Sequence, residues 1–140
     1  MTDDPKLDDY AFRTSDKIRF GDTDRQGHVN NAVFATLLEL GRAEMLFMPP
    51  APPLEPGTAI VVVRLVIDFK AELNWPGEVM IGTRVAGIGR SSARVEQALF
   101  QNGKCAAVAE GVIVLMDEAT RRSRPLPETD RAWLSQSMRG

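Results

Sequence analysis

One short segment of the chain gathers the residues best suited to chemistry. Asp24 and Gly27 lie in a turn-forming stretch, and His28 comes just before Asn31, where an apolar helical pattern begins. The start of a helix carries backbone N–H groups without internal partners and the positive end of the helix dipole, so it can stabilise a developing negative oxygen. A turn that folds the Asp24 carboxylate back toward this helix start would place a base or nucleophile beside an oxyanion site. Acyl transfer requires this combination.

Other interpretations of these residues stay open on physical grounds alone. Asp22 and Asp24 are common turn formers, His28 can pack, and Asn30 can cap the helix. By residue type, the two aspartates and His28 could also hold a metal ion, but the chain has no second histidine to support such a site. A Cys–His catalytic pair would need Cys105, the only cysteine, which lies in an Ala/Val-rich run typical of a buried strand. A reactive thiol needs an exposed, electropositive setting instead.

The composition is that of a single globular domain without a whole-chain positive field. The 140 residues are 44% hydrophobic, and 17 basic against 19 acidic residues give a net charge of -2. This balance argues against a nucleic acid or an anionic bilayer as partner. The longest apolar run, 59–63, is far shorter than the roughly 20 residues that cross a bilayer. Because the start of the chain is acidic and polar, unlike a signal peptide, we expect a cytoplasmic protein without a membrane segment.

A helix that positions this segment is predicted from about residue 30 to residue 46. Apolar side chains occur around most of its circumference, and Gly41 is the only Gly or Pro within it. A helix of this kind is normally surrounded by protein, so we expect it to be the central element of the fold. The next segment, 48–57, carries five prolines and must cross to the following element without regular structure.

A two-residue period replaces the helical one after the prolines. The odd positions from Val61 to Phe69 are all apolar, which predicts a strand with one buried face. A type I′ turn is expected at Asn102–Gly103, a short strand-like segment at 16–20 precedes the helix, and a short helix over 128–138 is expected at the end. Four long strands are predicted: 58–70, 78–87, 93–101 and 104–116. This order predicts an α+β fold in which an antiparallel sheet wraps around the long central helix.

With these residues in place, the sequence resembles the hotdog-fold acyl-CoA thioesterases, in particular the 4-hydroxybenzoyl-CoA thioesterase-like family. The positions that match the family signature are Arg19, Phe20, Asp22, Asp24, Gly27, His28, Val29, Asn30, Asn31, Glu39 and Arg42. The resemblance implies a single hotdog domain over 1–140, with its core at about 15–117 and a C-terminal extension at 118–140. It also implies hydrolysis of an acyl-CoA thioester, no cofactor beyond the coenzyme A of the substrate, and a homodimer, with a dimer of dimers as a further option, whose active sites lie at the dimer interface.

The family's catalytic roles fall on specific residues of this chain. The second aspartate of the family's D-x-D motif is the catalytic carboxylate, and it falls on Asp24. The helix-start amide that polarises the thioester carbonyl falls on Asn31, acting through its backbone N–H, and Gly27 allows the turn that brings the two together. Asp22 and His28 are expected to orient the turn, to hydrogen-bond or to position water.

A second carboxylate competes with Asp24 for the catalytic role. A related hotdog subfamily uses a glutamate on the central helix, and Glu39 occupies that position here. We favour Asp24, because its D-x-D-x-x-G context is intact and Glu39 can instead pair with Arg42 three residues later.

Coenzyme A carries phosphate charges, so basic residues are expected near the site entrance. Arg90, with Ser91 and Ser92, falls where family members often place nucleotide contacts, and the arginines of 121–124 form a second cluster. Each group could equally be solvated surface. The proline segment 48–57 is expected to form a stiff wall near the acyl pocket. Two other functions stay open: a hotdog dehydratase or hydratase acting on acyl-CoA or acyl carrier protein, and a hotdog protein that binds an acyl thioester without turnover.

Overall fold

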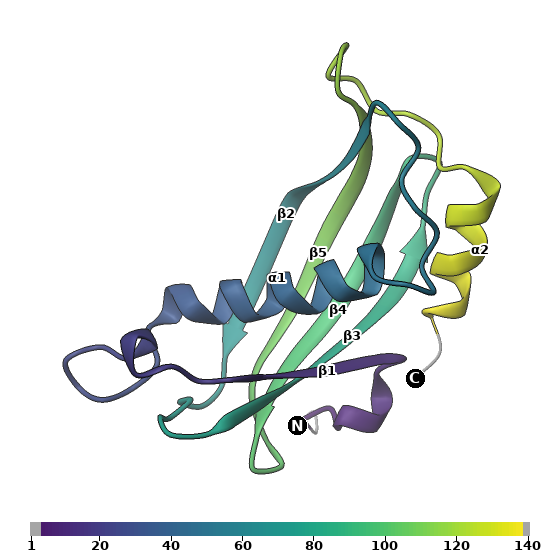
Figure 1. Cartoon of the computed structure of the whole chain (residues 1–140). Helices are drawn as coiled ribbons and strands as arrows, with labels where there is room; N and C mark the ends of the chain where they lie inside the picture. Colours follow the sequence, from purple (N-terminus) through teal and green to yellow (C-terminus); the bar gives the residue numbers. More distant parts are fainter. Residues whose placement is uncertain (1–3, 139–140) are drawn as a thin grey trace.

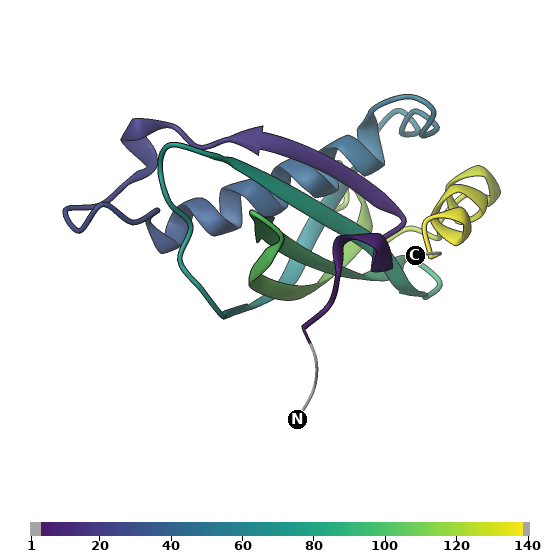
Figure 2. The same cartoon turned by 90° about the horizontal axis from the view of Figure 1, so that it is seen from below.

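The computed structural model describes residues 4–138. Five antiparallel strands form one sheet in the order β1-β3-β4-β5-β2, and helix α1 (Asn31–Phe47) lies across one face of it (Figure 1). Seen from below, the strands curve around this helix (Figure 2). The remaining elements are β1 (Phe12–Lys17), β2 (Thr58–Phe69), β3 (Glu78–Ile88), β4 (Ser92–Gln101), β5 (Lys104–Asp117) and α2 (Glu128–Gln136). The predicted α+β class and central helix are confirmed.

Helix α1 is held against the sheet by large apolar side chains and by one close approach of its backbone. Leu37, Leu38 and Met45 are fully buried. At Gly41, an added Cβ would lie 2.7 Å from Ile81 Cγ2 and 2.8 Å from Thr83 Oγ1. A glycine inside a helix costs about 1 kcal/mol relative to alanine. The close packing of α1 on β3 and β4 explains why the helix tolerates one here.

Strand β1 lies earlier in the chain than the sequence predicted. The expected strand at 16–20 is wrong in its bounds, because β1 pairs with β3 from Phe12 opposite Thr83 to Lys17 opposite Glu78. After Lys17 the chain enters a 3-10 turn in which the Arg19 N–H donates to Asp22 Oδ2 at 2.8 Å. This local hydrogen bond ends the strand just before the segment that carries the candidate catalytic residues.

Strand β2 is an edge strand whose buried face changes part-way along. It pairs with β5, and an extra residue at Val63 shifts the register between Val62 and Arg64. Beyond this bulge, Leu65 packs on the core as predicted, but before it Ile60 takes that role, and Val63 is 57% exposed. The prediction that the odd positions form one buried face was therefore wrong at Val63, because a bulge inverts the alternation of side chains. It was also wrong at Phe69, which is 48% exposed at the end of the strand.

The second half of the chain follows the predicted order of strands. Asn102 and Gly103 have φ of 53° and 79°, as a type I′ turn between β4 and β5 requires. Cys105 is buried in β5, as expected. Helix α2 packs at the C-terminal end of α1, where Trp133 Nε1 donates to the Met45 carbonyl at 2.9 Å. None of the helices within residues 4–138 is long and apolar enough to cross a membrane.

Candidate active site

A tight loop between β1 and α1 brings Asp24 and the start of the helix together, at the left of Figure 1. The Asp24 N–H donates to the His28 carbonyl at 2.8 Å, and the Gly27 N–H donates to the Asp24 carbonyl at 3.1 Å. Gly27 has φ of 82°, a left-handed conformation that glycine adopts without strain. The turn role predicted for Gly27 therefore has a conformational reason.

The Asp24 carboxylate is anchored through one of its two oxygens. Oδ1 accepts from the Gln26 N–H at 2.9 Å and from the His28 N–H at 3.2 Å. Within residues 4–138, Oδ2 has no hydrogen-bond donor, and the side chain is exposed. The loop thus fixes the carboxylate in place while leaving one oxygen free to react or to hold a water.

The N-terminus of α1 offers a free amide beside this carboxylate. Asn30 caps the helix, which was one of the roles that the sequence left open for it. Its Oδ1 accepts from the Ala32 N–H at 2.9 Å. The Asn30 N–H donates to the Asp22 carbonyl at 2.9 Å, and the Val33 N–H returns to the Asn30 carbonyl at 2.9 Å. The Asn31 N–H is the one amide of this first turn without an acceptor among residues 4–138. It is available to a carbonyl oxygen of a ligand.

Asp24 and Asn31 line one open depression of about 510 Å³, together with His28, Phe34 and Phe69. The two phenylalanines meet edge to face, with ring centroids 5.0 Å apart, and form an apolar wall between α1 and the end of β2. The sequence-predicted carboxylate, histidine and helix-start amide are therefore brought into one place, beside a surface that suits an apolar group.

The structure adds Glu72 to this depression, a residue that sequence reasoning missed. Its Oε2 lies 3.0 Å from His28 Nε2, because His28 and Asn74 form an isolated antiparallel bridge and the Val29 N–H donates to the Leu73 carbonyl at 2.9 Å. No motif marks Glu72 in the sequence. Within residues 4–138, no group of three or more His, Cys, Asp or Glu side chains is arranged to hold a metal ion.

Glu39 lies in a different depression, further along α1. This second depression, of about 270 Å³, is lined by Glu39 and Arg42 and otherwise by apolar residues of α1, β2 and β5. The Glu39–Arg42 ion pair that the sequence left open does not form, since no carboxylate oxygen of residues 4–138 lies within 4.0 Å of the guanidinium. Arg42 is instead buried and donates to Gln97 Oε1 at 3.1 Å. Burial lowers the pKa of Arg42, and the charge of Glu39 opposes that shift.

The serine and arginine residues predicted to bind phosphates lie at the other end of the molecule. Arg90 and Ser91 are in the β3–β4 turn, which contacts the C-terminal segment and β5: the Leu126 N–H donates to the Arg90 carbonyl and the Leu115 N–H of β5 to the Ser91 carbonyl, each at 2.9 Å. Ser92 begins β4. This turn lies near α2, whereas the loop between β1 and α1 lies at the opposite end of α1 (Figure 1). Within one chain, these residues are not brought next to Asp24.

The second basic cluster is partly engaged in ion pairs of its own. Arg124 contacts Glu55 and Asp117, each at 3.5 Å. Hydrogen bonds from the backbone N–H groups of Thr120 and Ala119 and the charge of Arg124 hold the pKa of Asp117 below its usual value. Arg121 and Arg122 are exposed. The arginines of 121–124 therefore lie on the surface without converging on the depression of Asp24.

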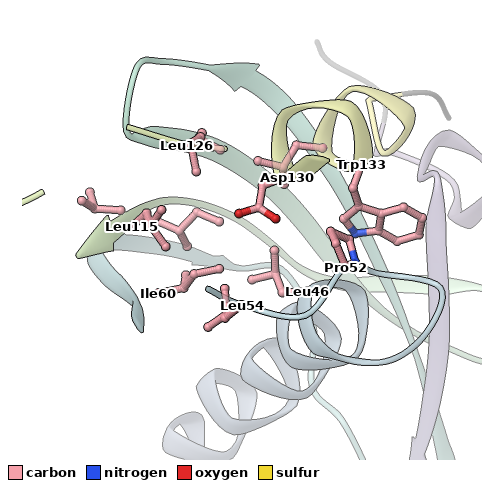
Figure 3. A pocket seen from close by; sticks show the side chains of 12 residues that line it. Leu46, Pro52, Leu54, Ile60, Leu115, Leu126, Asp130 and Trp133 are labelled. Carbon is pink, nitrogen blue, oxygen red and sulfur yellow. The ribbon is translucent and has the colours of Figure 1, made fainter. Parts of the chain in front are cut away.

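An apolar pocket lies where the proline segment, α1 and α2 meet (Figure 3). Pro52 and Leu54 of that segment line it together with Leu46 and Trp133. The carboxylate of Asp130 points into this pocket from α2 (Figure 3). Burial raises the pKa of Asp130, and the nearby Glu55 acts in the same direction. The proline segment thus forms the wall of a pocket at the C-terminal end of α1, remote from Asp24.

The family of the chain follows from its similarity to known proteins. A family model described as the thioesterase-like superfamily matches residues 18–134. A 1,4-dihydroxy-2-naphthoyl-CoA hydrolase from Synechococcus elongatus is 30% identical over 136 residues, 90% of this chain and 95% of that protein. A solved thioesterase from Thermus thermophilus, complexed with coenzyme A and Zn, is 33% identical, with a TM-score of 0.79 over 92% of this chain and 96% of that one. A solved protein from Pseudomonas aeruginosa is 25% identical, with a TM-score of 0.88 over 97% of each chain. The chain therefore belongs to the thioesterase-like superfamily of hotdog-fold thioester hydrolases.

Proposed function

We propose that this protein hydrolyses an acyl-CoA thioester to a free acid and coenzyme A, with Asp24 as the reacting carboxylate and the Asn31 amide as the oxyanion donor. One observation carries the proposal: the free Oδ2 of Asp24 and the unpartnered N–H of Asn31 line the same depression. A carboxylate beside a preorganised donor supplies both parts that acyl transfer needs. The relatives named as CoA hydrolases and thioesterases support the same reaction.

The reaction can proceed by two routes from this arrangement. In both, the Asn31 N–H donates to the thioester oxygen as negative charge develops on it, assisted by the dipole of α1. In the first route, Asp24 Oδ2 attacks the carbonyl carbon, the C–S bond breaks with its electron pair on sulfur, and water hydrolyses the mixed anhydride. In the second, Asp24 takes a proton from a water whose oxygen attacks the carbonyl carbon directly, and the C–S bond breaks with its electron pair on sulfur. Since the thiolate is a good leaving group, neither route needs a dedicated general acid.

The position of Glu39 favours Asp24 as the catalytic carboxylate. Glu39 is eight residues beyond Asn31, so it lies about 12 Å further along the helix axis and lines a separate depression. No free backbone amide lies beside it, because the interior N–H groups of a helix are already bonded. Within one chain, Glu39 therefore lacks the oxyanion donor that Asp24 has.

We further propose that the enzyme acts as a homodimer joined through β2. This strand forms an edge of the sheet, and it exposes apolar side chains that a second copy can cover: Val62, Val63, Val66 and Phe69. An exposed edge with apolar residues is a ready template for pairing with another chain. Arg90, Ser91 and Ser92 lie at the far end of α1 from Asp24, so they are better placed to reach coenzyme A bound at the partner's site than at their own.

The experiment that tests the function is thiol release from a panel of acyl-CoA esters, followed with a thiol reagent. The panel should start with aromatic acyl groups, because the Synechococcus relative is named for a naphthoyl ester, and extend to aliphatic chains. We expect turnover in the wild type, a loss of at least about a hundredfold in Asp24→Asn, and substantial turnover in Glu39→Gln. The reverse pattern would assign the reaction to Glu39.

The same panel separates the competing functions. A dehydratase or hydratase would change the acyl group without releasing thiol, and a binding protein would bind the esters without changing them. Light scattering of the purified protein would test the dimer and show whether dimers pair further. The cytoplasmic location stays a prediction.

A further inference from the structure

Arg42 is a buried charge with no carboxylate within 4.0 Å of its guanidinium among residues 4–138. It is 8% exposed, and the one hydrogen bond of its side chain among residues 4–138 is from Nη1 to the neutral Gln97 Oε1 at 3.1 Å. Burying a guanidinium without a carboxylate is costly, and a well-packed apolar residue of similar size would often be more stable. The position of this arginine is thus better explained by what it can bind than by the stability of the fold.

The guanidinium of Arg42 is held in place by the hydrogen bonds of Gln97. Gln97, which accepts its hydrogen bond, donates through Nε2 to the Leu38 carbonyl at 2.9 Å and to Thr83 Oγ1 at 3.0 Å. The close approach of α1 at Gly41 makes these contacts possible, because a Cβ there would lie 3.0 Å from Gln97 Nε2. The network holds Arg42 in one orientation, as a preorganised binding group requires.

The remaining donors of Arg42 reach open space. Within residues 4–138, no buried side-chain nitrogen or oxygen lacks a hydrogen-bond partner. The guanidinium nitrogens of Arg42 without a partner are therefore accessible, and Arg42 lines the depression that also contains Glu39. The other walls are apolar and include Leu46, Ile60 and Val62. The donor groups of Arg42 and the acceptor oxygens of Glu39 thus line the same apolar hollow without forming an ion pair.

This pairing of charges selects the chemistry of the occupant. A carboxylate would be attracted by Arg42 but repelled by Glu39, and an alkyl group would leave both charges unpaired. A hydroxyl group satisfies both, because its oxygen accepts from Arg42 while its proton is donated to Glu39. Hydrogen bonds to charged groups are stronger than those between neutral groups.

The hollow lies further along α1 and β2 than the depression around Asp24. The depression around Asp24 is bounded by Asn31 and Phe34 of α1 and by Phe69 of β2, and the second depression is bounded by the next turns of α1 and the earlier part of β2. Arg42 is eleven residues beyond Asn31, so it lies about 16 Å further along the helix axis. An extended aliphatic chain whose thioester oxygen binds the Asn31 amide can span this length.

We propose that Arg42 and Glu39 form a polar subsite that binds a hydroxyl group near the far end of an aliphatic acyl chain, and so select hydroxylated acyl thioesters. The inference rests on the proposed acyl-CoA thioesterase function. It also gives Glu39 a binding role in place of the catalytic one.

The test compares matched CoA esters that differ only in a terminal hydroxyl: ω-hydroxyoctanoyl, ω-hydroxydodecanoyl and ω-hydroxyhexadecanoyl-CoA, each against its unsubstituted acyl-CoA. We expect kcat/KM to favour the hydroxylated ester by about tenfold or more at one chain length. In Arg42→Met the ratio should fall to about one. Arg84→Met removes a half-buried arginine that pairs with Glu96 at 2.9 Å outside both depressions, so it should keep the wild-type ratio.

Each outcome bears on the inference. A wild type that shows no hydroxyl preference at any length, or an Arg42→Met variant that keeps the preference, overturns it. If Arg42→Met does not fold, Arg42→Lys serves instead, because it keeps the charge but loses the fork of donors and should lower the ratio part-way. An absence of thiol release from every ester, with or without the hydroxyl, would instead refute the proposed function.

Discussion

Replacing Gly41 by alanine tests whether the close approach of α1 to the sheet fixes the helix. In an exposed helix this change would add about 1 kcal/mol of stability, because alanine is the better helix former. Here the new methyl would lie 2.7 Å from Ile81 Cγ2, 2.8 Å from Thr83 Oγ1 and 3.0 Å from Gln97 Nε2. Unstrained carbon contacts lie at about 3.5–4.0 Å, so helix or sheet must move.

The size of the loss follows from two costs and one gain. Forcing a methyl group into a packed core costs about 1–3 kcal/mol. Displacing Gln97, whose Nε2 makes two buried hydrogen bonds, costs about 1–3 kcal/mol more when a polar group is left unpaired. Subtracting the gain of about 1 kcal/mol in helix propensity leaves a net loss of about 1–5 kcal/mol in the free energy of unfolding. That is a large part of the 5–15 kcal/mol, roughly, that holds a domain folded.

Urea unfolding at a fixed protein concentration measures this loss, since a dimer makes stability depend on concentration. The matched control is Gly21→Ala, where an added Cβ meets no atom within 4 Å, and it should change the free energy of unfolding by less than about 0.5 kcal/mol. If Gly41→Ala were as stable as the wild type, the close approach would not be the reason for the glycine.

Three further substitutions test the loop, the helix cap and the apolar pocket. Gly27→Ala should lower the free energy of unfolding by about 1–2 kcal/mol and reduce kcat, because Gly27 has φ of 82°; unchanged kcat and melting temperature would contradict this. Asn30→Ala should cost about 1 kcal/mol, since its side chain caps the Ala32 N–H, and a wild-type unfolding midpoint would refute it. Burial raises the pKa of Asp130, so the stabilising protonated form is lost as pH rises above about 4. The stability of Asp130→Asn should therefore rise relative to that of the wild type between about pH 4 and 7, by less than about 1 kcal/mol. Thermal melts in which the difference in stability shrinks as the pH rises would contradict this.

The part of the site that lies close together in the sequence could be predicted from it. Asp24, Gly27 and Asn31 lie within eight residues, and a glycine turn followed by an apolar helix allows few other arrangements. Glu72 could not be predicted, because its nearness to His28 depends on a bridge between two loops that are far apart in the chain.

The fold shows the same division between local and long-range causes. Alternating apolar residues predicted β2, but not the bulge at Val63, which is set by its pairing with β5. The helix pattern predicted α1, but not that Arg42 hydrogen-bonds to Gln97 on β4. That contact needs the approach at Gly41, and the sequence marks this approach only as one glycine in an apolar helix.

Helix α1 connects the two proposed binding features. It carries the oxyanion donor at its start and Arg42 of the proposed hydroxyl subsite about 16 Å further along. The contact at Gly41 lies on the same helix, next to Arg42, so a shift of the helix on the sheet moves both. Gly41→Ala should therefore lower kcat and the preference for hydroxylated esters together. Asp24→Asn should lower kcat alone, and Arg42→Met should remove the preference while Asp24 and Asn31 keep their places. Separate loss of the two properties in Gly41→Ala would mean that the site and the subsite do not depend on a common placement of the helix.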